Sequence, residues 1–336
     1  KIMKKSNIKI IAEAGVNHNG SINLALKLID AASEAGADFV KFQHTNPENA
    51  SSKAPLVDYQ KAKRLKNQKS MIKDFHLNWS KAYPILIKRA KQKKIKFMQS
   101  FFSALDYIDS KKYNFDYIKI PSSDIINIPL LEAVGKDNKK IFLSTGMANL
   151  KEIKDAIKTL TRNGTKRSNI VIFHCVSSYP TPITKVNLNS ILFLRKKLNL
   201  QVGLSDHTKD QFASALALNL GCNTFEKHFT LSKKLKGPDH KLSLDTNELR
   251  NFVFNLKNYY KAYGKYEKKC LDIEKQAREV TRQSVHAKEF IKKGVLFTRK
   301  NTMLKRPGNG VKPSYYKKLL KQKAKRNFKI DEAIKL

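Results

Sequence analysis

Cysteine, proline and glycine are all scarce in this sequence of 336 residues, which contains 3, 10 and 13 of them. The shortage of glycine and proline excludes collagen-like, proline-rich and flexible-linker proteins. The three cysteines, Cys175, Cys222 and Cys270, stand too far apart to form a CxxC metal pair. A sparse, odd set of cysteines is typical of reduced thiols inside a cell. No apolar run approaches a membrane span or a signal peptide, so we expect a soluble, cytoplasmic protein without membrane association.

Acidic residues are also few, since 28 Asp and Glu stand against 67 Lys and Arg and the net charge is +39. One interpretation is a nucleic-acid-binding protein. However, only 11 of the basic residues are Arg, the side chain that reads guanine and stacks on bases, and there is a single Trp. The lysines are spread over almost every segment. This pattern favours a lysine-rich, solvated surface and argues against nucleic acid as a partner.

Short runs of β-forming residues alternate with longer segments of helical period along most of the chain. Two apolar stripes have helical spacing: one is formed by Ile22, Ala25, Leu26, Ile29 and Ala32, and the other by Ile153, Ala156, Ile157 and Leu160. The strand candidates are residues 8–12, 38–42, 95–99, 116–120, 140–144, 169–174, 201–204 and 223–228. Eight strands, each followed by helical sequence, predict an α/β fold, a (β/α)8 TIM barrel of about 250 residues. A doubly wound open sheet is the alternative, but no GxGxxG turn follows the first strand.

The pattern changes after residue 263, which predicts a division into domains. We expect the barrel to occupy residues 1–263, a charged linker residues 264–282, and a small compact domain residues 283–336. Within the barrel, residues 47–78 are too many for an ordinary connection between a strand and a helix. The length of this connection predicts a functional segment that extends over the barrel mouth.

Polar residues follow the predicted strands where these end, and in a (β/α)8 barrel such ends form the active-site mouth. In chain order they are Glu13, Asn17, His18 and Asn19; Lys41 and Gln43; Gln99 and Ser100; Lys119, Ser122, Ser123 and Asp124; Ser144 and Thr145; His174, Ser177, Ser178 and Tyr179; Ser205, Asp206 and His207; and Glu226, Lys227 and His228. Ammonium groups together with hydroxyls suit the phosphate or carboxylate of a small ligand. The alternative for Lys41 and Lys119 is a solvated surface position, although each follows an apolar run.

Two histidines and one glutamate in this set point to specific chemistry. His207 and His228 follow the last two strands, and two neutral imidazoles can bind a divalent transition metal while leaving positions open for substrate and water. The alternative is a pair of hydrogen-bonded core histidines. Glu13 is a candidate general acid or base, or a carboxylate that neutralises Lys41. The spacing leaves both pairs of alternatives open.

Nine stretches of the chain together resemble a known family, although none of them would be decisive alone. They are IAEAGVNHNGS (11–21), VKFQ (40–43), YIKIPSSD (117–124), FLSTGMANLKEI (142–153), HCVSSYPTP (174–182), GLSDHT (203–208), FEKHFTL (225–231), GPDHKLSLDTNEL (237–249) and KRPGNG (305–310). In this order they resemble the sialic acid synthase (NeuB-type) family, over essentially the whole chain. Residues 283–336 resemble that family's antifreeze-like (SAF) domain.

The resemblance implies a metal-dependent condensation of phosphoenolpyruvate with N-acetylmannosamine in its open aldehyde form, which gives N-acetylneuraminate and phosphate by C–O cleavage. The alternative within the same chemistry is an N,N'-diacetyllegionaminate synthase, which uses 2,4-diacetamido-2,4,6-trideoxymannose. The stretches GPDHKLSL (237–244) and APLVDYQ (54–60) resemble these two groups more than pseudaminate synthases. The implied cofactor is a divalent metal ion on His207 and His228, with Mn²⁺ as the first expectation and Mg²⁺ or Co²⁺ as alternatives.

Matched positions in the family imply a role for each site residue. Glu13, Lys41 and Lys119 would be catalytic, with Glu13 handling protons. Phosphoenolpyruvate would be held by Lys41, Ser100, Lys119, Ser122, Ser177 and Ser205. The sugar would contact Gln43, Asp124, Tyr179, Asp239 and Arg306.

Arg306 differs from the other site residues because it lies in the small C-terminal domain. The family places this arginine in the active site of a neighbouring subunit, which implies a domain-swapped homodimer. The alternative is that Arg306 only braces the turn at residues 307–310. Three positions depart from the family pattern: Ser100 stands where Thr and then Pro are usual, Asp124 replaces a common Glu, and Val176-Ser177 stands where an amide side chain is frequent. The histidines, the lysines and Glu13 are all present, so we expect activity.

Overall fold

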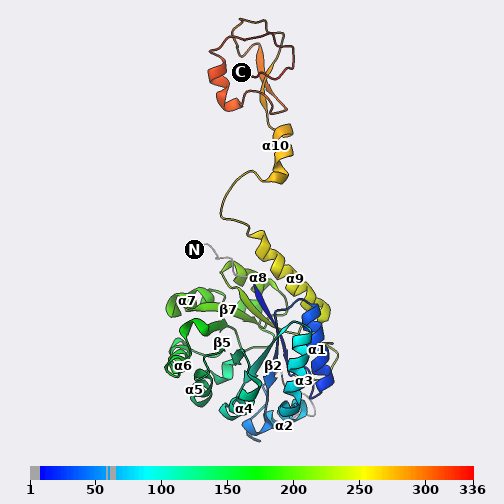
Figure 1. Cartoon of the computed structure of the whole chain (residues 1–336), viewed down its shortest axis with the longest axis vertical. Coiled ribbons are helices and arrows are strands. Elements are labelled where there is room, and N and C mark those ends of the chain that lie inside the picture. The colour runs from blue at the N-terminus through cyan, green and yellow to red at the C-terminus, as the bar shows by residue number, and fades with distance from the viewer. Residues whose placement is uncertain (1–7, 58–59, 61–65) are drawn as a thin grey trace. The chain divides into compact units, whose positions relative to one another are not determined.

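The structure is a computed structural model that describes residues 8–57, 60 and 66–336. The chain forms two compact units, Lys1–Gly264 and Lys265–Leu336. Figure 1 shows strands enclosed by helices in the first unit and a smaller unit that contains the C-terminus. Each unit has a hydrophobic core of its own.

The first unit is a closed barrel in which the strands pair in chain order from β1 to β8, and β8 pairs again with β1. All eight pairings are parallel. The strands are β1 (Lys9–Gly15), β2 (Phe39–His44), β3 (Lys96–Phe101), β4 (Tyr117–Ile120), β5 (Lys140–Ser144), β6 (Ile170–His174), β7 (Gln201–Asp206) and β8 (Thr224–His228). The predicted (β/α)8 barrel is confirmed, and the strand bounds differ from the prediction only at their ends.

The helices surround this barrel and connect its strands (Figure 1). They are α1 (Ile22–Glu34), α2 (Gln68–Phe75), α3 (Trp79–Gln92), α4 (Ala104–Ser110), α5 (Ile128–Gly135), α6 (Leu150–Arg162), α7 (Asn189–Leu198), α8 (Phe212–Asn219) and α9 (Thr246–Ala262). The sequence determines where α6 begins, because the Asn149 side chain accepts from the backbone of Glu152 and the Glu152 side chain accepts in return. Its predicted stripe is buried along its whole length. The chain leaves α1 through Gly36, whose φ of +79° favours glycine.

The long connection after β2 contains a short 3-10 helix, η1 (Pro47–Asn49), and α2. It is fastened to α4 because Asn46 and Asn49 donate hydrogen bonds of 2.9 and 2.6 Å to the carboxylate of Asp106. Two residues of the 54–60 stretch, Asp58 and Tyr59, lie outside the described residues. That this segment covers the barrel mouth stays a prediction.

The second unit contains the 3-10 helix η7 (Asp272–Glu274), α10 (Lys275–Thr281) and α11 (Tyr316–Leu319), together with β9 (Ser284–Ala287) and β10 (Thr302–Lys305). The two strands pair antiparallel. Its core is formed by Val285, Ala287, Ile291, Phe297, Leu319, Ala324, Phe328 and Ile334. The assignment of this unit as an antifreeze-like domain stays a prediction. Among the helices of the described residues, none has the length and apolar character that crossing a membrane requires.

Candidate active site

The inside of the barrel consists of an apolar layer and a polar layer. Successive residues of a strand point to opposite faces, so every second residue faces the interior. The apolar layer is formed by Ile11, Phe39, Met98, Phe142, Val171 and Phe173. Two residues further along the same strands stand Glu13, Lys41 and Ser100, all buried. The polar layer therefore lies toward the carboxyl ends of the strands, where such barrels carry their active sites.

A buried network of two lysines and two glutamates forms the centre of the polar layer. The Nζ atom of Lys119 lies 2.7 Å from both carboxylate oxygens of Glu226. The Nζ atom of Lys41 lies 2.9 Å from Glu13 Oε1 and 3.6 Å from Glu226 Oε2, and it donates to Ser100 Oγ at 3.0 Å. Both lysines are 2–3% exposed, which excludes the solvated-surface alternative for them.

The charges in this network follow from burial and from the pairing. Burial by itself would raise the pKa of Glu226, but the ion pairs with Lys119 and Lys41 outweigh it and hold the pKa below its usual value. For Glu13 burial dominates and raises the pKa, although Lys41 acts in the opposite direction. Glu226 is therefore the stable anion, while Glu13 is the carboxyl group that can carry a proton. That is the property required of a general acid.

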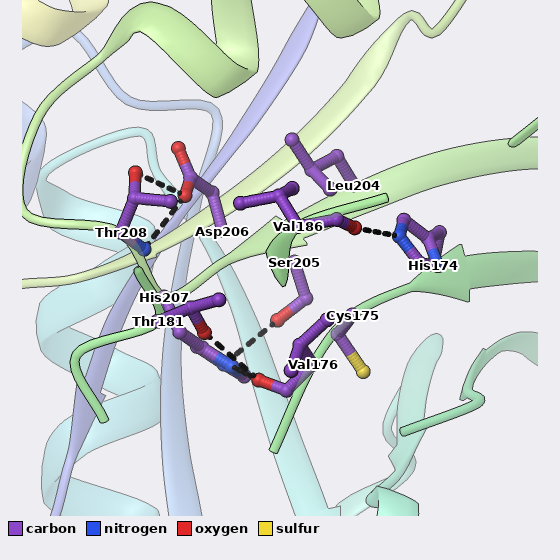
Figure 2. Close-up of a pocket in the computed structure, with 10 residues that line it drawn as sticks. All are labelled: His174, Cys175, Val176, Thr181, Val186, Leu204, Ser205, Asp206, His207 and Thr208. Carbon is purple, nitrogen blue, oxygen red and sulfur yellow. Dashed lines mark hydrogen bonds between the residues drawn. The ribbon is translucent and has the colours of Figure 1, made fainter. Parts of the chain in front are cut away.

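The two histidines lie at the next level of the mouth, on β8 and just after β7. His207 and His228 have ring centroids 5.6 Å apart. The Nδ1 atom of His207 is 2.7 Å from the carbonyl oxygen of Val176, so Nδ1 donates and Nε2 is the lone-pair nitrogen (Figure 2). Burial lowers the pKa of each histidine to about 3. Both rings are therefore neutral near pH 7, which is the form that binds metals.

The histidine pair has the donor chemistry of a divalent-cation site. The Nδ1 atom of His228 and the Oε2 atom of Glu13 are buried without a hydrogen-bond partner among the described residues. Asp239 Oδ2 lies 3.8 Å from that Nδ1 atom. Within the described ranges, no group of three or more His, Cys, Asp or Glu residues is arranged to hold a metal. The residues present fit a cation bound by two imidazoles, with its other positions left to substrate and water.

Glu13, Gln43 and Asp239 meet on one side of the mouth. Gln43 Nε2 donates to Glu13 Oε1 at 2.8 Å. A Cβ atom at Gly15, whose φ is +53°, would meet Asp239 Oδ2, Gln43 Nε2 and Glu13 Oε1 at 3.4–3.5 Å. Burial, and then the neighbouring charge of Glu13, raise the pKa of Asp239 to about 7. These side chains can donate to and accept from hydroxyl or amide groups of a ligand.

Ser122 and Ser177 meet on the other side, around Gly146. A Cβ atom at Gly146 would stand 2.3 Å from Ser177 Oγ and 2.8 Å from Ser122 Oγ. Ser122 Oγ accepts from the backbone nitrogen of Gly146 at 3.1 Å and lies 3.2 Å from Cys175 Sγ. Ser205, on β7, is hydrogen-bonded to Glu226 at 2.9 Å, so the hydroxyls extend around the mouth from the lysine network.

The remaining residues with an implied sugar contact lie in different surroundings. The ring of Tyr179 covers the histidine pair, with its centroid 4.2 Å from that of His207. Asp124 is bound locally by Ser123 and Asn127. Arg306 belongs to the second unit, where it is exposed.

The turn next to Arg306 is held by other residues. Ser284 donates to the carbonyl oxygen of Pro307 at 2.7 Å, and the ring of His286 lies 3.1 Å from the same oxygen. Within the described part of the chain, Arg306 makes no hydrogen bond to this turn. The structure therefore gives no support to the bracing alternative.

Several of the strand-end residues do not join the mouth, which corrects that part of the prediction; His18, for one, packs against Phe42 and Trp79. Gln99, His174, Asp206 and Lys227 are buried, but the strand period turns them toward the helices. His174 Nε2, for example, lies 2.7 Å from the carbonyl oxygen of Val186.

Two residues of the mouth had no role in the prediction. Glu226 is the counter-ion of both lysines, and Cys175 lies beside Ser122. The signal that identifies Glu226 is its position two residues before His228, on the same face of β8.

Comparison with known proteins gives a consistent result. The NeuB family model matches residues 28–268. The chain is 44% identical to the N,N'-diacetyllegionaminic acid synthase of Campylobacter jejuni, over 99% of this chain and 100% of that protein. It is 37% identical to the protein of the same name from Legionella pneumophila, over 91% and 87% of the two chains.

A solved structure agrees with these relatives. The N-acetylneuraminic acid synthetase of Leptospira borgpetersenii, crystallised with citrate, has 31% identity and a TM-score of 0.71, over 81% of this chain and 90% of that one. The family model covers well over half of this chain, and the first relative covers nearly all of it. The chain is an enzyme of the NeuB family, the family of the sialic-acid-type synthases that it matches.

Proposed function

We propose that this enzyme condenses phosphoenolpyruvate with 2,4-diacetamido-2,4,6-trideoxymannose and water to give N,N'-diacetyllegionaminate and phosphate. The observation that carries the choice of sugar is the 44% identity to a synthase of that name along the whole chain. N-Acetylmannosamine, the sugar expected first from the sequence, is less well supported, because the relatives of 44% and 37% identity both carry the legionaminic name.

The lysine network suits an anionic substrate. In the proposed complex the phosphate and carboxylate of phosphoenolpyruvate lie among Lys41, Lys119 and the hydroxyls of Ser100, Ser122, Ser177 and Ser205. Both lysines are buried and Lys41 stays protonated, since attraction to Glu13 and Glu226 outweighs the effect of burial and raises its pKa. Charge-assisted hydrogen bonds in such a buried site are stronger than those at a surface.

The proposed reaction forms one carbon–carbon bond and breaks one carbon–oxygen bond. C3 of phosphoenolpyruvate attacks the aldehyde carbon of the sugar, and positive character develops at C2. Water adds to C2 and gives up two protons, one that restores the proton of Glu13 and one that goes to the leaving phosphate, while the C2–O bond breaks and C2 becomes a ketone. Glu13, the carboxyl group with the raised pKa, donates a proton to the aldehyde oxygen as it becomes a hydroxyl group.

His207 and His228 would hold a divalent cation, Mn²⁺ first and Mg²⁺ or Co²⁺ as alternatives. A cation bound there supplies Lewis-acid polarisation of the aldehyde oxygen. Gln43, Tyr179 and Asp239 surround the same space and would orient the sugar, with Asp124 and Arg306 as further contacts. The three free cysteines and the need for phosphoenolpyruvate are in keeping with a reaction in the cytoplasm.

The rim of the mouth supports the further proposal of a homodimer with exchanged C-terminal units. Large apolar side chains are exposed in the connections or first helical turns after β3 to β7: Leu105, Ile126, Ile128, Met147, Ile183 and Phe212. Apolar side chains gathered on one rim are typical of a surface that a partner covers. In the proposed dimer a partner's second unit covers this rim and supplies its arginine 306.

The test is phosphate release from phosphoenolpyruvate with Mn²⁺, measured with each sugar and with an EDTA control. We expect metal-dependent release that is at least tenfold faster with the diacetamido sugar. Faster release with N-acetylmannosamine would refute the choice of sugar, and release unaffected by EDTA would refute the metal.

A pair of variants tests the histidine site in the same assay. His207→Gln should abolish release. His174→Gln is the matched control. His174 is also a buried histidine at the carboxyl end of a strand, β6, but its side chain faces the helices. Equal loss in both variants would contradict the assignment of His207.

A further inference from the structure

A buried ion pair lies directly behind the histidines, on the outer face of the barrel wall. Asp206 on β7 and Lys227 on β8 are register partners, and each is 2% exposed. Lys227 Nζ lies 3.2 Å from Asp206 Oδ2. Because side chains alternate along a strand, this pair is back to back with His207 and His228, which follow it by one residue.

The pair fastens the loop that begins at His207. Besides Asp206, Lys227 donates to the carbonyl oxygens of Thr208 at 2.6 Å and Asp210 at 2.7 Å, so all three protons of its ammonium group are used. Asp206 Oδ1 accepts from the backbone nitrogen of Thr208 at 2.9 Å and from its hydroxyl at 2.7 Å (Figure 2). Ser214 on α8 donates to Asp206 Oδ2 at 2.7 Å.

His207 is thereby fixed on both sides. On the β6 side, its Nδ1 atom contacts the Val176 carbonyl oxygen, and its own carbonyl oxygen accepts from Thr181 at 2.8 Å. On the β8 side, Lys227 ties the residues that follow His207 to the strand that carries His228.

Stability alone is a poor explanation for this arrangement. Buried ion pairs are often no more stabilising than apolar residues of the same volume, because both charges lose their hydration. What such a pair supplies here is geometry, since an ammonium group must point at three fixed oxygens. Groups that orient metal ligands from behind typically contribute 10–100-fold to metal affinity.

We propose that Lys227 and Asp206 are positioning residues that set the distance between His207 and His228, and with it the affinity of the site for a divalent cation. This inference rests on the proposed function of the histidine pair. It assigns a role to two buried charged residues that the reaction itself does not use.

The experiment measures the dissociation constant of Mn²⁺ from the signal of free Mn²⁺ in electron paramagnetic resonance, on the full-length protein. Lys227→Met should weaken Mn²⁺ binding by about tenfold or more. Saturating Mn²⁺ should restore most of the turnover number of this variant, which separates weakened binding from damaged chemistry. A dissociation constant within twofold of the wild type would overturn the inference.

Two further variants keep the test decisive. Lys257→Met is the control for losing a paired lysine, because Lys257 also contacts an aspartate (Asp38, 3.8 Å) and a backbone carbonyl (Gly36, 2.7 Å), at the surface ahead of β2 rather than behind the histidines. It should leave Mn²⁺ affinity unchanged. If Lys227→Met does not fold, Thr208→Val decides, since it retains the ion pair and removes the bonds that the Thr208 hydroxyl makes with Asp206, Lys227 and the Asp210 carbonyl oxygen. That variant should weaken Mn²⁺ binding severalfold, and an unchanged affinity overturns the inference.

The wild type distinguishes this inference from the proposed function. If the wild-type protein fails to bind Mn²⁺, the assignment of the histidine pair is itself wrong. If the wild type binds and Lys227→Met binds equally well, only the role of the outer ion pair is refuted.

Discussion

Replacing Glu226 with Gln tests the electrostatic centre of the barrel. The Glu226 carboxylate lies 2.7 Å from Lys119 Nζ and 3.6 Å from Lys41 Nζ, and all three side chains are buried. Glutamine keeps the shape and the ability to accept hydrogen bonds but removes the charge. The two ammonium groups then have only Glu13 as a counter-ion, and burial favours the neutral form of that group.

The expected loss of stability follows from the burial of the pair. Removing one partner of a buried ion pair costs about 3–5 kcal/mol. We expect the lower end of this range, about 3 kcal/mol. Glutamine retains hydrogen bonds, and the loss of the Glu226 charge lowers the pKa of Glu13, which can then partly neutralise the two ammonium groups. For a domain of this size, that corresponds to a fall of roughly 6–12 °C in the unfolding temperature.

The assay is thermal unfolding at pH 7.5 in EDTA, with and without phosphoenolpyruvate. The ligand brings anionic groups to the lysines, so it should stabilise Glu226→Gln more than the wild type. Glu48→Gln is the control, because Glu48 pairs with Lys69 at the surface and such pairs contribute little. An unfolding temperature for Glu226→Gln within about 2 °C of the wild type would refute the charged, paired state of Glu226.

Three further predictions concern the rest of the site. Gly146→Ala should raise the KM for phosphoenolpyruvate more than tenfold with little change in unfolding temperature, because the new Cβ would stand 2.3 Å from Ser177 Oγ; an unchanged KM would contradict the phosphate assignment. Asp239 is protonated more easily when folded, with a pKa of about 7, so its own contribution to wild-type stability in EDTA should fall as pH rises from 4 to 7, while the buried histidines contribute in the opposite direction. Asp239→Asn should lack that fall, which amounts to roughly 4 kcal/mol in urea unfolding, and equal slopes for both proteins would count against it. Finally, co-expressed Glu13→Gln and Arg306→Ala chains should form hybrid dimers that regain activity, whereas inactive hybrids would exclude an exchanged arginine.

The fold could be predicted from the sequence because its signals are local. Each barrel strand is a short apolar run. The start of a helix such as α6 is predicted by its capping box, and its buried face is predicted by the 3.6-residue period of its apolar side chains. The carboxyl ends of parallel strands meet at one mouth, so Glu13, Lys41 and His228 could be brought together without coordinates.

The direction in which strand-end side chains point was harder to predict. Their place at the strand ends predicts that Asp206 and Lys227 line the mouth, yet both face the helices. Side chains alternate in direction along a strand, so the sequence gives the direction of each one only after one residue of that strand is known to face the interior.

The sequence by itself determined the barrel, the position of its mouth and most of the residues that line it, because strand period, capping and chain order are properties of neighbouring residues. Only the tertiary structure decided the charge state of those residues. Lys119 and Glu226 are 107 positions apart, and no local pattern shows that they form the central ion pair. The raised pKa of Glu13 likewise comes from burial by the whole barrel, since desolvation depends on every element packed around a carboxyl group.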